Sequence, residues 1–174
     1  MTDTTGRTYI ALGTNLPLEG LFGAALLSQA LESIAGAGVK VCLRSSPWRS
    51  PPWPAELKDQ PHFVNEVAEI DPGALTAPDL FTVLAGVEIA FGRERQVRWG
   101  ARTLDLDLLD YKGFVGRAGA LTLPHPRLAE RAFVLAPLAE IAPIWRHPAL
   151  GLSAAALLQR LGDQGVERLE PDAG

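Results

Sequence analysis

The run from Leu104 to Leu108 restricts the possible fold more than any other segment, because leucine and aspartate alternate along it. Successive side chains of a β-strand point to opposite faces, so the leucines share one face while Asp105 and Asp107 share the other. The leucine face predicts packing against a core, and the acidic face predicts a cleft or solvent. Two such carboxylates suit Mg²⁺, although a solvated strand face explains the spacing equally well.

A dense group of arginines lies directly before this strand and includes Arg93, Arg95, Arg98 and Arg102. Guanidinium groups bind phosphate oxygens through paired hydrogen bonds and stay charged at any working pH. The glycine and charge content of residues 92–100 favours a loop that closes on a ligand. An ordinary basic loop paired with surface acids is the alternative, and the neighbouring aspartates favour polyphosphate binding over it.

Composition limits the class of protein. The chain has 174 residues, of which 47% are hydrophobic, and this predicts one compact domain with a substantial core. Its formal net charge of −4 argues against broad nucleic-acid binding, which needs a basic surface. The single cysteine, Cys42, lies in an apolar alternation that predicts a buried structural thiol. No segment has the pattern of a signal peptide or a membrane span, so we expect a soluble, cytoplasmic protein.

Hydrophobic periodicity predicts alternating strands and helices along the chain. The expected strands lie at 7–12, 39–44, 63–70 and 103–111, and the expected helices lie at 18–34 and 76–91. This order predicts an α+β, ferredoxin-like βαββαβ fold, with an antiparallel sheet and both helices packed on one face. A hairpin near 112–123 and short helices at 128–141 and 153–161 are expected to follow, and residues 162–174 are expected to fray.

Two segments depart from this regular pattern. Five prolines between Pro47 and Pro61 predict an irregular surface loop that could cover a ligand. In the third strand, Glu66 and Glu69 fall on opposite faces, which predicts that the strand is curved or lies near a sheet edge.

Three side chains outside the acidic strand suit a flat, phosphorylated ligand. Phe63 and Asn65 share one strand face, so a flat ring could stack on the first and hydrogen-bond to the second, although Phe63 alone fits a core position better. His125 lies between two prolines and could donate to a phosphate, although a surface histidine is the simpler interpretation. The sequence has neither a P-loop nor a dinucleotide fingerprint, so nucleotide binding needs another kind of site.

The ordered motifs resemble the 6-hydroxymethyl-7,8-dihydropterin pyrophosphokinase family. The matching segments are 98–107, 11–16, 49–52, 59–61, 63–65 and 121–125, with Arg131 and Phe133. The resemblance implies a single pyrophosphokinase domain over residues 1–174, which transfers diphosphate from ATP to the hydroxymethyl group of the pterin and releases AMP in folate biosynthesis. A non-catalytic pterin- or nucleotide-binding module is one alternative, and a ferredoxin-like interaction domain is another.

The resemblance also implies roles for individual residues. Catalysis would fall to Arg93, Arg95, Asp105 and Asp107, and the two aspartates would bind two Mg²⁺ ions together with ATP. ATP would contact Glu88, Arg95, Arg98, Trp99, Arg102, His125 and Arg131. The pterin would contact Ser50, Pro51, Pro52, Trp53, Phe63, Asn65, Trp99 and Phe133, with its ring between the two phenylalanines. ATP would bind first, and we expect a monomer whose partners are small molecules, with no nucleic acid or membrane among them.

Overall fold

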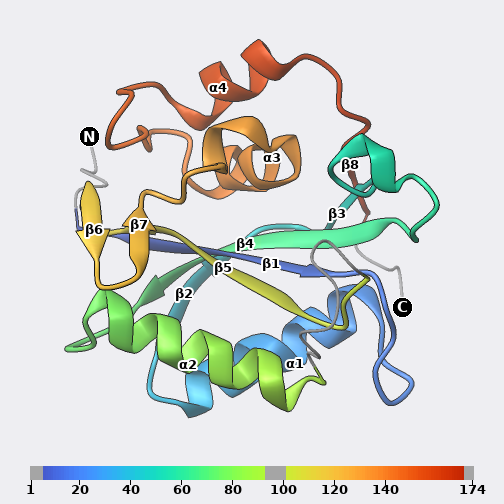
Figure 1. Ribbon diagram of the computed structural model, residues 1–174, viewed down its shortest axis with the longest axis horizontal. Helices are drawn as coiled ribbons and strands as arrows, with labels where there is room; N and C mark the ends of the chain where they lie inside the picture. Colours follow the sequence, from blue (N-terminus) through green and yellow to red (C-terminus); the bar gives the residue numbers. More distant parts are fainter. Residues whose placement is uncertain (1–5, 93–100, 171–174) are drawn as a thin grey trace.

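The computed structural model describes residues 6–92 and 101–170 as an antiparallel sheet between two layers of helices (Figure 1). The strands are β1 (Thr8–Thr14), β2 (Lys40–Arg44), β3 (Trp48–Ser50), β4 (Phe63–Asp71), β5 (Asp105–Tyr111), β6 (Gly116–Ala118), β7 (Leu121–Leu123) and β8 (Glu167–Arg168). The α-helices are α1 (Gly23–Gly36), α2 (Ala77–Ala90), α3 (Ala132–Ile141) and α4 (Ala154–Leu161), and short 3₁₀ turns are η1 (Ala55–Leu57) and η2 (Leu128–Glu130). No helix in these described ranges is long and apolar enough to cross a membrane.

The main sheet has the strand order β5-β1-β4-β3-β8, and β2 also pairs with β4. β1 lies between β5 and β4 and is antiparallel to both. β2 and β3 pair with different halves of β4, so β4 is an interior strand and the expectation of an edge position is wrong. The helices α1 and α2 cover one face of the sheet (Figure 1). The expected α+β, ferredoxin-like fold is confirmed, and β6 and β7 add a separate hairpin.

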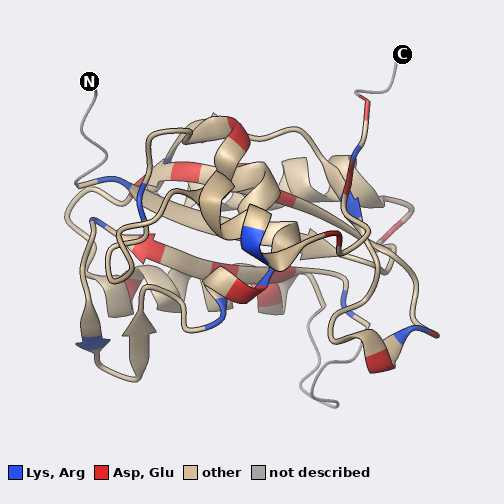
Figure 2. Ribbon diagram, turned by 90° about the horizontal axis from the view of Figure 1, so that it is seen from above, with Lys and Arg blue, Asp and Glu red and all other residues tan. Residues whose placement is uncertain are grey.

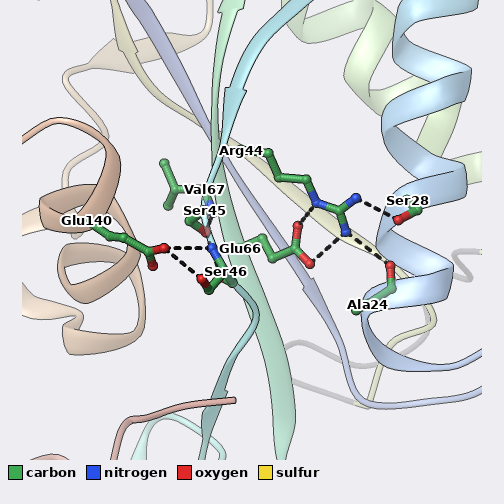
Figure 3. Close-up of polar contacts among 8 residues, drawn as sticks. All are labelled: Ala24, Ser28, Arg44, Ser45, Ser46, Glu66, Val67 and Glu140. Carbon is green, nitrogen blue, oxygen red and sulfur yellow. Dashed lines mark hydrogen bonds and ion pairs between the residues drawn. The ribbon is translucent and has the colours of Figure 1, made fainter. Parts of the chain in front are cut away.

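Two carboxylates on β4 are buried because arginines from other elements pair with them. Glu66 is fully buried and accepts two hydrogen bonds from Arg44, which also donates to Ser28 Oγ and to the carbonyl of Ala24 on α1 (Figure 3). Burial raises the pKa of Glu66, and the hydrogen bonds from Arg44 offset only part of that rise. These charge pairs explain how an interior strand can carry charged residues on both faces, since Glu69 binds Arg7 at 2.8 Å.

Each layer of helices encloses its own hydrophobic core, and the alternation of strand residues divides the side chains between them. The core beneath α1 and α2 includes Ile10, Leu12, Leu26, Leu80, Leu104, Leu106 and Leu108. The core beneath α3 and α4 includes Tyr9, Val67, Leu109, Leu135, Leu138 and Trp145. The leucine face of β5 therefore packs against α1 and α2, as its sequence predicts, while Asp105 and Asp107 point to the other side.

The proline-rich segment is more regular than its composition predicts. Pro47 and Pro51 flank β3 without interrupting it, so β3 pairs with β4, and η1 follows. The residues after Gly162, expected to fray, include β8, which pairs with β3 through Trp48 and Arg168. Pairing with β3 orders this segment despite its polar composition.

A β-bulge in β2 corrects the prediction for Cys42. The pairing with β4 shifts register between Val41 and Leu43, so the alternation of faces is interrupted at this point. Cys42 is exposed, and Leu43 is 45% exposed. The expectation of a buried structural thiol is therefore wrong.

Candidate active site

A pocket opens on the side of the sheet that carries α3, and strands far apart in sequence form its walls. It is lined by Ala11, Leu12, Gly13, Ser50, Pro51, Trp53, Phe63, Asn65, Arg102, Asp105, Asp107, Arg131 and Phe133. The pocket is concave and open to solvent, and its lining combines apolar and aromatic side chains with a few charged groups, which suits a small-molecule site. Most residues predicted to bind pterin or metal therefore meet in one place.

The acidic end of the pocket is formed by β5 beside β1. Asp105 and Asp107 lie opposite Gly13 and Ala11 in the pairing, and their side chains are 31% and 28% exposed. Arg102 Nη1 donates to Asp105 Oδ1 at 2.7 Å, so one wall of this end already carries an ion pair. The site therefore places oxygen ligands and guanidinium donors side by side, as a phosphate–cation complex needs.

Arg131 connects the acidic end to the aromatic end. It lies at the start of α3, its Nη1 donates to Asp107 Oδ2 at 3.1 Å, and its side chain is 9% exposed. Its guanidinium carbon lies 5.0 Å from the ring centre of Trp53 and 5.6 Å from that of Phe133. The buried Nε has no hydrogen-bond partner among the described residues, which leaves a donor for a ligand.

His125 lies beside the acidic end without lining the pocket. Its Nδ1 accepts from the backbone N–H of Arg127 at 3.2 Å, and its Nε2 lies 3.8 Å from Asp107 Oδ1. Burial lowers the pKa of His125 to about 4, and the positive charges of Arg131 and Arg127 act in the same direction, while Asp105 opposes them. The ring is therefore neutral near pH 7, with its N–H at Nε2.

The aromatic end of the pocket contains a fixed amide. Asn65 is buried, and its Nδ2 donates to Ser50 Oγ at 2.8 Å and to the carbonyl of Trp48 at 3.4 Å. Both N–H groups of Nδ2 are thus used by acceptors of the protein, so Oδ1 is the atom of this amide that can accept from a ligand. Phe63 also lines this end, and the Trp53 and Phe133 rings meet edge-on with centres 6.5 Å apart.

Gly13 is a site residue that the sequence reasoning did not select. A Cβ atom at this position would lie 3.2 Å from Asn65 Oδ1 and 3.7 Å from a ring carbon of Phe63. A glycine inside a strand signals the close approach of another group, and this signal was present in the sequence. Gly13 therefore keeps the pocket floor open beside the amide.

Other predicted residues do not line the pocket. Glu88 is buried on α2, and its Oε1 accepts from the backbone N–H of Leu106 at 2.7 Å, which satisfies a donor on the edge strand. Pro52 is also buried and lies outside the lining. Arg93, Arg95, Arg98 and Trp99 fall outside the described residues.

Acidic and basic residues are mixed over the described part of the chain, with no large region of one sign in the view of Figure 2. Figure 2 views the molecule from the side of α3 and α4 and shows acidic and basic positions interspersed. Within residues 6–92 and 101–170, no group of three or more His, Cys, Asp or Glu side chains is arranged to hold a metal ion. A cation at Asp105 and Asp107 would therefore need further ligands from a bound substrate or water.

Comparisons with known proteins agree with the chemistry of the pocket. The family model for 7,8-dihydro-6-hydroxymethylpterin-pyrophosphokinase matches residues 9–143. A 2-amino-4-hydroxy-6-hydroxymethyldihydropteridine pyrophosphokinase from Methylorubrum extorquens is 41% identical over 94% of this chain and 99% of its own. A protein of the same name from Pseudomonas aeruginosa is 39% identical over 94% of this chain and 96% of its own.

A solved structure supports the fold independently. Plasmodium falciparum HPPK-DHPS with pteroate is similar with a TM-score of 0.67 and 12% identity. The similarity covers 88% of this chain and 42% of the Plasmodium chain, so the present chain spans less than half of that protein. At this level of identity the similarity shows a shared fold.

Proposed function

We propose a division of roles for this pocket from one premise: the chain belongs to the 7,8-dihydro-6-hydroxymethylpterin-pyrophosphokinase family. It is an ATP-dependent diphosphokinase that transfers diphosphate to the hydroxymethyl group of 6-hydroxymethyl-7,8-dihydropterin in folate biosynthesis. ATP is the co-substrate, and removal of its terminal diphosphate leaves AMP.

Asp105 and Asp107 are the residues that would hold Mg²⁺. They offer oxygen ligands from one strand face, and both side chains are partly exposed to the pocket, which fits a hard divalent cation. When bound, Mg²⁺ would offset phosphate charge and polarise the phosphorus under attack. We expect two ions, as the family resemblance implies, and ATP would supply further oxygen ligands because the described residues offer no group of three or more ligand side chains.

The arginines would bind the phosphates of ATP. Arg102 and Arg131 already lie against the two aspartates, and the unpartnered Nε of Arg131 is a buried donor suited to an anionic oxygen. His125 would act as a neutral N–H donor, since its pKa is lowered to about 4. Arg93, Arg95, Arg98 and Trp99 are proposed to complete this end, as the family resemblance implies. Glu88 is proposed as an ATP contact from the family resemblance alone, and in the structure its carboxylate accepts from the backbone N–H of Leu106.

The aromatic end would bind the pterin. Phe63 and Phe133 both line the pocket, and we propose that the ring stacks between them. Asn65 Oδ1 would accept from a ring N–H or amino group, because Ser50 and Trp48 occupy its Nδ2. Pro51 and Trp53 would close this side of the ring, and Pro52 would support them from behind.

The reaction needs alignment more than covalent participation by the protein. The pterin hydroxyl oxygen forms a bond to the β-phosphorus, the bond from that phosphorus to the oxygen of the α-phosphate breaks, and AMP leaves with that oxygen. The hydroxyl proton is released to solvent or to a nearby carboxylate, for which Asp107 is the candidate. Arg131 lies between the two ends of the pocket, so it can orient the phosphates toward the pterin.

The single observation that carries this assignment is the convergence of Asp105 and Asp107 with Phe63, Asn65 and Phe133 in one pocket. The test incubates the enzyme with ATP, Mg²⁺ and hydroxymethyldihydropterin and separates the products by chromatography. We expect AMP and the pterin diphosphate in equal amounts, with no ADP. The Asp105→Asn variant should lose this activity, whereas Glu32→Gln, which changes an exposed carboxylate on α1, should keep it.

An ADP product, or full activity in Asp105→Asn, would contradict the assignment.

We also propose that residues 1–174 act as one domain and as a monomer in the cytoplasm. The family match over residues 9–143 and the two helix-covered cores on one sheet support the single domain.

A further inference from the structure

Glu140, near the end of α3, accepts hydrogen bonds from the segment that leads into β3. Its Oε1 accepts from the backbone N–H of Ser46 at 3.0 Å and from Ser46 Oγ at 2.7 Å (Figure 3). Its Oε2 accepts from Trp48 Nε1 at 2.9 Å. Burial raises the pKa of Glu140, but these hydrogen bonds and the charge of Arg168 outweigh it and hold the pKa below its ordinary value. The side chain is therefore a charged acceptor near pH 7.

A third element meets α3 and β3 at the same point. Arg168 on β8 donates to Ser46 Oγ at 2.8 Å and lies 3.5 Å from Glu140 Oε1. The next residue, Leu169, donates its backbone N–H to the carbonyl of Pro47 at 2.9 Å. Glu140 is thus the shared acceptor where α3, β3 and β8 join.

Both elements joined by Glu140 carry walls of the pocket. β3 and the following residues supply the first wall, which contains Ser50, Pro51 and Trp53, and the start of α3 supplies the second, which contains Arg131 and Phe133. α3 runs from Ala132 to Ile141 with Pro137 inside it, and Phe133 lies about 10 Å along its axis from Glu140. The hydrogen bonds of Glu140 near the C-terminal end of α3 therefore influence where Phe133, near its N-terminal end, lies relative to β3.

The hydrogen bonds of Glu140 are also linked to the side-chain amide of Asn65 in the pocket. The side-chain N–H of Trp48 donates to Glu140, and the backbone carbonyl of Trp48 accepts from Asn65 Nδ2. Ser50, two residues further along β3, accepts from the same amide nitrogen. A displacement of β3 would therefore both separate the walls and release the orientation of Asn65.

We propose that Glu140 is a positioning residue that sets the spacing of the two walls and the orientation of Asn65, and so determines affinity for the pterin more than for ATP. The inference rests on the proposed function, because it presupposes that the pterin binds between β3 and α3. The two aspartates of the acidic end lie on β5, and Arg102 holds Asp105, so a shift of β3 leaves them in place and a shift of α3 reaches this end only through Arg131.

The test measures KM for the pterin and KM for ATP in Glu140→Ala. We expect the pterin KM to rise about tenfold, as loss of an orienting hydrogen bond would produce, while the ATP KM changes less than about twofold. Trp48→Phe removes the indole N–H donor and keeps an aromatic side chain, so it should shift the pterin KM in the same direction by less. Glu140→Gln keeps one acceptor oxygen and should also be intermediate. These two variants carry the test if Glu140→Ala does not fold.

Glu69→Gln is the matched control, because Glu69 is a buried carboxylate that binds Arg7 at 2.8 Å on the half of β4 away from β3. It should lower stability and leave the pterin KM unchanged. An unchanged pterin KM in folded Glu140→Ala, or an equal rise in Glu69→Gln, would overturn the proposal. Asn65→Ala separates the two hypotheses: if it too leaves the pterin KM unchanged, the assignment of the pocket itself has failed.

Discussion

The carboxylates of β4 and those of β5 both pair with arginine, yet they differ in burial and in what surrounds them. On β4, Glu66 is fully buried against Arg44, which is also bound to α1. On β5, Asp105 and Asp107 retain 31% and 28% exposure and face a pocket. The β4 pair has its hydrogen-bonding capacity satisfied within the protein, whereas the β5 pair can exchange its partners for a ligand. Exposure, and what else the arginine contacts, distinguishes a structural ion pair from a functional one.

The largest expected effect tests the β5 pair. Asp107→Asn keeps the shape of the side chain and removes the charge that would hold Mg²⁺ and Arg131. We expect kcat to fall about 10³-fold, because charge stabilisation in the pocket is lost. The free energy of unfolding should change by less than about 1 kcal/mol, since the side chain is partly exposed. Steady-state kinetics and urea unfolding check both values, and a comparable loss of stability would remove the distinction between the strands.

The reciprocal change tests the β4 pair. Arg44→Met leaves the buried carboxylate of Glu66 without its charge partner, so we expect a loss of about 3 kcal/mol in the free energy of unfolding. The kcat of the folded protein should stay within about twofold of the parent, because a stability change outside the pocket does not alter the chemical step. The double variant Arg44→Met with Glu66→Met should recover most of the stability. Failure to recover it would show that the pair contributes more than charge compensation.

A pH effect tests the burial of His125 beside the acidic end of the pocket. The pKa of His125 is lowered to about 4 in the folded protein from 6.5, so the unfolded chain binds more protons between these values. Stability should therefore fall as pH decreases from 6.5 to 4, by at most about 3 kcal/mol from this residue. Unfolding at several pH values should show a shallower dependence of stability on pH in His125→Gln than in the parent. An unchanged slope in His125→Gln would contradict a buried, neutral ring.

The smallest expected effect concerns the pocket floor. Gly13→Ala places a methyl group 3.2 Å from Asn65 Oδ1, so we expect the pterin KM to rise about fivefold, or roughly 1 kcal/mol. Gly36→Ala is the control, because a Cβ atom there meets nothing within 4 Å. Equal kinetics for the two variants would mean that the floor tolerates the added atom.

Local patterns predicted the fold more fully than they predicted the pocket. The alternation in β5 and the helix expected from residue 76 depend on neighbouring residues, and the structure confirms both, with a capping box of Thr76 and Asp79 at the start of α2. The bulge at Cys42 was not predictable, because it arises from pairing with β4. The interior position of β4 was missed for a similar reason, since Arg44 lies 22 residues away in sequence from Glu66.

The pocket shows the same limit. The alternation of acids on β5 identified Asp105 and Asp107 as candidates, but their spacing alone did not decide between a metal site and a solvated strand face. The pairing of Asn65 with Ser50 and the approach of Gly13 to Asn65 are contacts between separate strands. Glu140 was not selected at all, because nothing in its neighbourhood in the sequence indicates that it contacts Ser46, 94 residues earlier.

The pairing of β8 with β3 has a mechanical consequence. β8 is short and lies at the edge of the sheet, and Arg168 and Leu169 connect it to Ser46 and Pro47. Tension applied to the chain beyond β8 would act first on these few hydrogen bonds and on the pocket wall that β3 carries. The two hydrophobic cores would be affected only after these hydrogen bonds had broken. Displacing β8 is therefore expected to disturb the wall of the pocket on β3 before it disrupts either core.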